Sequence, residues 1–162
     1  IEDTDITKHT INGEKIKALT TTVSEEDYLI KIMKGALKNN MPNKDTVVSR
    51  DHKIMYRNKL LAAGSLVKLI PNRIFRIENN KPQLYNILLN KYATMIVNNL
   101  LVETLHPEHI VAKLYNEDNC EIINGKLEIK PRRKWMITQI NECIRQRDLN
   151  KINDLKWLCA GN

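Results

Sequence analysis

Short runs of aliphatic and β-branched residues, each closed by Asn, Gly or Pro, recur along most of the sequence and restrict what this chain can fold into. An Asn-Gly pair follows Ile11, and Asn-Asn pairs follow Glu78 and Val97. Such pairs favour tight turns, and the runs between them are typical of strands. We therefore predict a mainly β fold. The predicted strands are Lys15–Leu19, Asp27–Met33, Thr46–Ser49, Lys53–Tyr56, Ser65–Ile70, Ile74–Ile77, Leu84–Leu89 and Thr94–Val97.

The spacing of apolar residues changes near Pro131. Beyond this proline, Met136, Ile140 and Ile144 follow a helical period, and Asp148 is a suitable N-cap for a second helix. The pattern predicts three regions. They are a β domain over residues 1–115, a linker over 116–130 and a helical hairpin over 131–162, with helices at about Pro131–Arg147 and Asp148–Leu158.

Composition excludes several classes of protein. Hydrophobic residues make up 42% of the 162 residues, but no apolar stretch approaches the roughly 18 residues of a membrane span, so we expect no membrane association. Cys120, Cys143 and Cys159 are widely spaced, which is typical of reduced, buried thiols and indicates an intracellular location. No signal peptide is visible. Because the sequence opens on Ile1 and not on Met, we expect that residues precede it in the gene or that the chain was cut.

The chain is basic, with a formal net charge of +7. Basic residues are most frequent from Lys126 onward, where Glu142, Asp148 and Asp154 alternate with them. This alternation is typical of a solvated helix face, whereas a nucleic-acid site usually gathers its positive charge on one face. Nucleic-acid binding is therefore an alternative that we favour less than protein partners.

Two blocks of sequence contain the candidate functional residues. In the first, Asp45–Ile54, a β-branched strand ends in Ser49-Arg50-Asp51-His52. In the second, Leu84–Leu105, a strand beginning Leu84-Tyr85-Asn86 leads to a hairpin, and the chain continues as Glu103-Thr104-Leu105-His106-Pro107.

Taken together and in this order, the two blocks resemble the Hint domain family of hedgehog and intein proteins, in the form found in proteins of large DNA viruses. The resemblance covers roughly residues 1–115. It implies a horseshoe-like arrangement of curved strands. It also implies self-processing chemistry, in which a first residue, usually Cys, attacks the preceding carbonyl and converts a peptide bond into a thioester or ester.

The resemblance gives roles to three residues. His52 stands at the histidine position of the Thr-x-x-His motif and would protonate the leaving amide nitrogen, since imidazole titrates near neutral pH. Ser49 stands at the threonine position and would be the hydrogen-bonding companion of His52. Asn86 stands where many inteins carry an aspartate after the tyrosine. These three are the predicted catalytic positions.

The sequence also departs from the family pattern. The nucleophile block has no match, and we expect that it would lie upstream of Ile1. Tyr92 replaces a histidine of the hairpin, and Glu103-Thr104 replaces the terminal His-Asn pair with which inteins cleave their C-terminal side. At most, the resemblance therefore implies hedgehog-like cleavage at the N-terminal side, and we expect the chain as given to be inactive.

Two functional hypotheses follow. The favoured one is a Hint fold without catalysis, acting as a structural or interaction module, with a virion as one candidate assembly and location. The alternative is the C-terminal part of an autoprocessing Hint domain. A metal site formed by His106, His109 and the glutamates beside them is disfavoured against a solvated loop, because no third ligand has suitable spacing. We expect neither a metal nor a cofactor.

Overall fold

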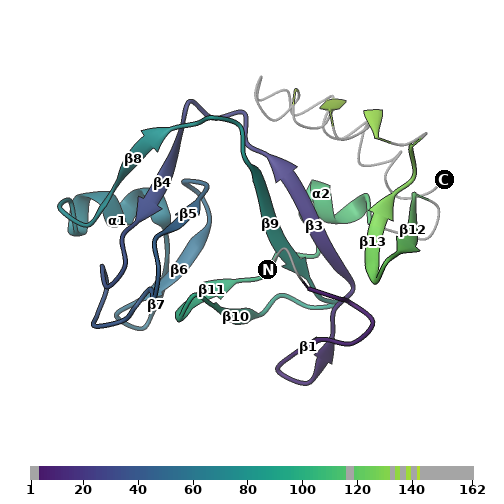
Figure 1. The fold of residues 1–162 in the computed structure, drawn as a ribbon, viewed down its shortest axis with the longest axis horizontal. Coiled ribbons are helices and arrows are strands. Elements are labelled where there is room, and N and C mark those ends of the chain that lie inside the picture. Colours follow the sequence, from purple (N-terminus) through teal and green to yellow (C-terminus); the bar gives the residue numbers. More distant parts are fainter. Residues whose placement is uncertain (1–3, 116–118, 132–133, 136–137, 140–141, 143–162) are drawn as a thin grey trace. The chain divides into compact units, whose positions relative to one another are not determined.

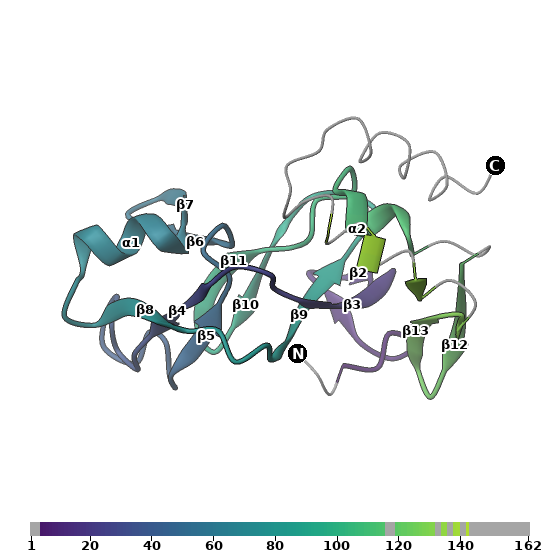
Figure 2. The same cartoon turned by 90° about the horizontal axis from the view of Figure 1, so that it is seen from above.

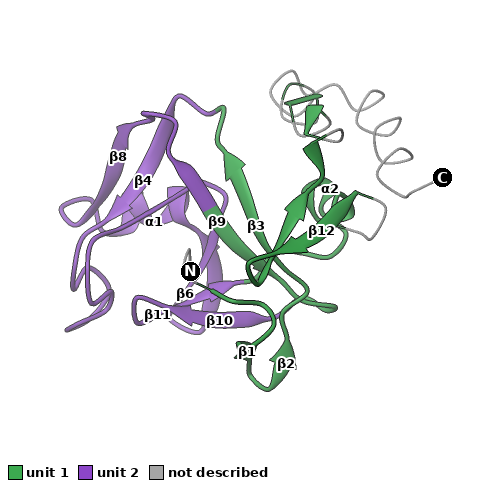
Figure 3. Cartoon of the chain, turned by 45° about the vertical axis from the view of Figure 1, so that its right-hand side comes forward, with its two compact units in different colours: residues 1–25, 85–92, 104–162 green, residues 26–84, 93–103 purple. Residues whose placement is uncertain are grey.

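The computed structural model describes residues 4–115, 119–131, 134, 135, 138, 139 and 142. In this part of the chain the fold is mainly β, with several small antiparallel sheets and two short helices (Figure 1). The prediction of a mainly β fold is confirmed. The chain divides into two units, each assembled from separate segments (Figure 3). Unit 1 comprises residues 1–25, 85–92 and 104–162, and unit 2 comprises residues 26–84 and 93–103.

The first sheet of unit 2 has three antiparallel strands. The central strand is β4 (Tyr28–Ile32), which pairs with β5 (Thr46–Val48) on one side and with β8 (Ile74–Glu78) on the other. Ile30 lies opposite Val48 and Arg76 in the register. Leu29, Ile30 and Ile32 of β4 are buried, and helix α1 contacts this strand.

The second sheet of unit 2 has the order β10-β11-β6-β7. Its two hairpins turn at adjacent residues with positive φ, Arg57-Asn58 and Asn98-Asn99, a backbone conformation that Asn tolerates well. Ile54 lies opposite Val102 at the centre of the sheet, and both are buried. The strands are β6 (Lys53–Tyr56), β7 (Lys59–Ala62), β10 (Thr94–Val97) and β11 (Leu100–Glu103).

The segment predicted as strand Ser65–Ile70 is a helix, so that prediction was wrong. Helix α1 (Ala63–Leu69) follows β7 directly (Figure 2). It buries only Ala63 and Leu66, three residues apart on one helical face, and leaves Leu69 57% exposed. Periodicity cannot separate a short apolar run in a strand from one in a helix, and the Val and Ile of this run favoured the wrong choice.

Aliphatic side chains from both sheets and from α1 form the buried interior of unit 2, as the low aromatic content predicts. The members with the lowest exposure are Leu29, Ile30, Ile32, Ile54, Ala63, Leu66, Ile74 and Leu100.

Unit 1 is organised around a two-stranded sheet of β3 (Ala18–Val23) and β9 (Gln83–Leu88), whose first two residues belong to unit 2. The small hairpin of β1 (Thr10–Ile11) and β2 (Glu14–Lys15) precedes it and turns at the predicted Asn-Gly pair. Ala18 and Leu88 join a core cluster with residues of the later segments.

Those later segments include α2 (Ile110–Lys113), β12 (Cys120–Ile123) and β13 (Lys126–Ile129). The last two form a hairpin within residues 116–130, which the sequence analysis assigned to a linker. The missed signal is the pair Asn124-Gly125, where both residues have positive φ. The buried cluster is Ala18, Leu88, Ile110, Val111, Ala112, Leu114, Tyr115, Cys120 and Ile129.

The predicted helical hairpin over 131–162 lies outside the described residues apart from a few isolated positions, so it stays a prediction, as does the horseshoe arrangement. No helix in the described part of the chain is long and apolar enough to span a membrane.

Candidate functional site

Ser49 and His52 lie in one tight turn between β5 and β6 of unit 2. The backbone N–H of His52 donates to the backbone oxygen of Ser49 at 3.3 Å. The spacing Ser-x-x-His therefore corresponds to a single turn of backbone that brings these two predicted site residues together.

Helix α1 holds this turn from one side. The N–H groups of its first two residues, Ala63 and Gly64, donate to the carbonyl oxygens of His52 (2.9 Å) and Arg50 (2.8 Å). The first N–H groups of a helix have no partner within it, and Ala62 at the N-cap provides no side-chain hydrogen bond. The carbonyls of the turn take over the capping role. The approach is close, because a Cβ atom at Gly64 would lie 3.3 Å from the oxygen of Arg50.

The side chain of Arg50 ties the turn to residues near the start of β4. Its Nη2 lies 3.2 Å from Oε1 of Glu26, and its Nε lies 3.7 Å from Oδ2 of Asp51. A hydrogen bond with Tyr28 and the charge of Glu26 raise the pKa of Arg50 above its ordinary value. The turn is thus fixed by side chains as well as by its backbone.

Glu103 holds the turn from β11. Its Oε1 accepts a hydrogen bond from the backbone N–H of Lys53, the residue after His52, at 2.9 Å. From the sequence, Glu103 was considered as a departure from the family pattern and as a disfavoured metal ligand, and this hydrogen bond was not predicted. The pairing of the two blocks was the available signal, since β11 and β6 are neighbours in one sheet.

His52 is partly buried, and its environment changes its titration. Loss of hydration by burial lowers the pKa of the imidazole below 6.5, while the negative charge of Glu103 opposes that change. The neutral imidazole is therefore favoured at pH 7. In that form one ring nitrogen donates and the other accepts, which suits a group that moves a proton between two partners.

Asn86, the third predicted site residue, lies on β9 in unit 1. Its side-chain Oδ1 accepts from the N–H of Ile87 at 2.8 Å, and its backbone oxygen accepts from Oγ1 of Thr20 at 3.2 Å. The buried Thr20 thus anchors Asn86 to β3. A joint site of Asn86 with Ser49 and His52, which belong to the other unit, stays a prediction.

His106 and His109, which the sequence offered as metal ligands, have structural roles in the region after β11. Nδ1 of His109 accepts from the N–H of Val111 and caps α2, and Nδ1 of His106 accepts from the N–H of Glu108. The ring of His106 also packs on Tyr92, with 5.1 Å between centroids. Among the described residues, no group of three or more His, Cys, Asp or Glu side chains is placed to hold a metal ion.

Thr104, which stands at the position of the terminal asparagine of inteins, is fully buried. The N–H of the next residue, Leu105, donates to the oxygen of Ile87 at 2.8 Å. The chain then continues through α2 to Tyr115, whose hydroxyl accepts from the N–H of Thr21 at 3.1 Å. Backbone at this position is therefore part of the folded interior of unit 1.

The matched residues of a family model decide the classification. A model of the Hint domain matches residues 8–109, which is more than half of the chain. The chain belongs to the Hint domain family. The match includes both sequence blocks and the turn of Ser49 and His52, so the resemblance seen in the sequence is confirmed at the level of the family. Comparisons with curated proteins and with solved structures found no match. None of these comparisons supports a viral origin.

Proposed function

We propose that this Hint domain promotes cleavage of the peptide chain on its N-terminal side, with His52 as the group that moves the proton. A thiol or hydroxyl would attack the carbonyl carbon, forming a carbon–sulfur or carbon–oxygen bond as the carbon–nitrogen bond breaks. The proton of the nucleophile would pass through His52 to the departing amine. The supporting observation is the turn of Ser49 and His52, which α1 and Glu103 hold in place.

The surroundings of Thr104 favour cleavage at the N-terminal side only. Asparagine cyclisation needs an asparagine at this position, and Thr104 lacks the amide nitrogen that would attack. Thr104 is also buried, and the chain continues into α2 and the packed Tyr115. A free end at this position would remove part of the unit 1 core.

We infer that the nucleophile lies outside the 162 residues, because the block that carries it in the family has no match in them. The three cysteines of the sequence are Cys120, Cys143 and Cys159, all beyond the stretch that matches the family. We therefore propose that the 162 residues alone are inert. General acid–base help supplies only about 10²–10⁴-fold, far short of what hydrolysis of an unactivated peptide bond requires.

The test is expression of the complete gene product, with whatever residues precede Ile1, followed by incubation with dithiothreitol. Two results together support the proposal. The complete gene product releases an N-terminal fragment that ends next to this domain, and the 162-residue chain, expressed alone, keeps its mass. A complete gene product that stays intact in dithiothreitol would contradict it.

The second candidate is a Hint fold that has lost catalysis and binds protein partners in a larger assembly, such as a virion. Two observations favour it. The sequence departs from the family pattern at Asn86 and Tyr92, and apolar side chains are exposed at Ile96 (74%) on the edge strand β10 and at Ile122 (61%) on β12. Protein partners, nucleic-acid binding and an intracellular location stay predictions of the sequence. Size-exclusion chromatography with light scattering of wild type and of Ile96→Ser tests self-association through this edge.

A further inference from the structure

The peptide group that joins His52 to Lys53 is held at both of its polar atoms by different elements of unit 2. Its carbonyl oxygen, on His52, accepts from the N–H of Ala63 in α1 at 2.9 Å. Its N–H, on Lys53, donates to Oε1 of Glu103 in β11 at 2.9 Å. The Cα atom of His52 is bonded to this peptide group, so the orientation of the peptide group determines the position from which the His52 side chain extends.

The contact from Glu103 depends on the sheet register. Val102 lies opposite Ile54, which places Glu103 at the end of β11 beside the first residue of β6. From there its side chain accepts the N–H of Lys53. Gln would also offer an oxygen as acceptor, but only Glu brings a negative charge.

We propose that Glu103 is a positioning residue for His52, fixing the peptide group that carries the imidazole and supplying the negative charge that an imidazolium ion needs beside it. The inference rests on the proposed function and extends it. At the position where inteins carry the histidine of their C-terminal step, this chain carries a carboxylate that supports the histidine of the N-terminal step.

Electrostatics give the charge a role in proton transfer. Burial disfavours the imidazolium form of His52, and the negative charge of Glu103 favours it. The other charged groups around the turn are Glu26, Arg50, Asp51 and Lys53. Arg50 is paired with both Glu26 and Asp51. The charge that acts on the pKa of His52 is that of Glu103, which raises it. Glu103 therefore keeps the imidazole able to accept a proton despite its burial.

The experiment separates the hydrogen bond from the charge by two substitutions in the 162-residue chain. Glu103→Gln keeps an oxygen for the N–H of Lys53 and removes the charge, whereas Glu103→Ala removes both. The control is Glu121→Gln, which makes the same charge change at an exposed site on β12 in the other unit. NMR titration of His52 and hydrogen exchange at Lys53 are the readouts.

Glu103→Gln should lower the pKa of His52 by about 0.5–1 unit and leave exchange at Lys53 near the wild-type rate. Glu103→Ala should lower the pKa and also speed exchange at Lys53 by about tenfold or more. Glu121→Gln should change neither. An unchanged pKa of His52 in Glu103→Gln, or unchanged exchange at Lys53 in Glu103→Ala, would overturn the proposal.

Cleavage of the complete gene product distinguishes this inference from the proposed function. If cleavage occurs, the pH of half-maximal rate should fall in Glu103→Gln by the same amount as the pKa of His52. Cleavage with a wild-type pH profile in that variant would overturn the role of Glu103 alone. Absence of cleavage in the wild type would overturn the proposed function. The NMR result would then show that Glu103 positions His52, but not that this contact serves catalysis.

Discussion

At the scale of single residues, the turn that carries His52 shows how the local sequence determines the geometry of the backbone. Gly64 allows α1 to approach the carbonyl of Arg50, and Ala62 leaves the helix start without a side-chain cap, so the turn supplies both acceptors. The SxxH spacing was readable from the sequence. Glu103 was not, because its contact with Lys53 depends on the register of two strands about fifty residues apart.

The pH dependence of stability should report the burial of His52. Its pKa is lower in the folded chain than the 6.5 of an unfolded one, so the contribution to stability is complete above pH 6.5. It is lost as the pH falls through the folded pKa, because the unfolded chain binds the proton more readily. Urea denaturation at pH 7.5 and pH 5 should show a smaller loss in His52→Gln than in wild type. Equal losses would mean that His52 is hydrated in the folded chain.

Two isoleucines of the same sheet should differ in their effect on stability. Ile54 on β6 is fully buried, and Ile54→Ala should lower the free energy of unfolding by about 2–5 kcal/mol. Ile96 on β10 is 74% exposed, and Ile96→Ala should cost less than about 0.5 kcal/mol. Urea denaturation of both variants is the check. A large cost at Ile96 would mean that a partner or a second copy covers β10.

At the scale of elements, the sequence predicted strands best where β-branched runs meet Asn turns. Lys53–Tyr56 and Thr94–Val97 were predicted with the bounds observed, whereas α1 was predicted as a strand and the hairpin of β12 and β13 was missed. In α1 tertiary packing selects a helical face of only two buried residues. Such a choice depends on neighbours from distant parts of the chain.

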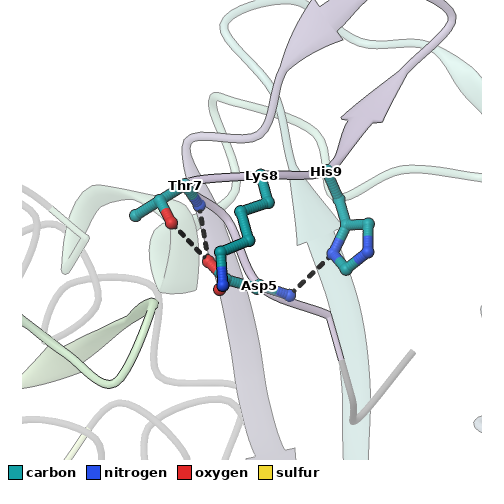
Figure 4. Close-up of polar contacts among 4 residues, drawn as sticks. All are labelled: Asp5, Thr7, Lys8 and His9. Carbon is teal, nitrogen blue, oxygen red and sulfur yellow. Dashed lines mark hydrogen bonds and ion pairs between the residues drawn. The ribbon is translucent and has the colours of Figure 1, made fainter.

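The missed hairpin contacts the N-terminal segment of unit 1. The N–H of Ile6 donates to the oxygen of Gly125 at 2.8 Å. Figure 4 shows the turn beside it, where Oδ1 of Asp5 accepts from the N–H and the hydroxyl of Thr7, and the N–H of Asp5 donates to Nδ1 of His9. The hydrogen bonds from Thr7 lower the pKa of Asp5 to about 2. The hairpin, which lies beyond the family match, therefore helps to fix residues 5–9.

A matched pair of glycines tests this contact. Gly13 and Gly125 both follow Asn in two-residue hairpins and have φ of +80° and +74°. A Cβ atom at Gly13 would meet open space, but at Gly125 it would collide with the carboxylate of Asp5. Gly13→Ala should cost roughly 1–2 kcal/mol from its backbone conformation alone.

Gly125→Ala should cost more than Gly13→Ala and should shift the NMR amide signals of residues 5–9. Denaturation and NMR spectra of the two variants provide the comparison. Equal stability losses, with unchanged signals at residues 5–9, would mean that the N-terminal turn does not pack on the hairpin.

At the scale of the whole molecule, the chain combines a family match over residues 8–109 with a folded continuation as far as β13. The continuation supplies Ile110, Leu114, Cys120 and Ile129 to the core of unit 1. A chain end after Thr104 would therefore remove part of the core of unit 1. The family could be predicted from two short blocks, because their order and spacing are specific. The contribution of residues 110–129 to the core of unit 1 could not be predicted, since it depends on packing between residues far apart in the sequence.

If His52 moves the proton in N-terminal cleavage, the rate at which dithiothreitol releases the fragment from the complete gene product depends on this side chain. Intact-mass spectrometry measures that rate. His52→Ala should slow release by at least about tenfold. His106→Ala, a histidine outside the turn, should release the fragment at the wild-type rate. Equal rates in wild type and His52→Ala would mean that His52 does not move the proton.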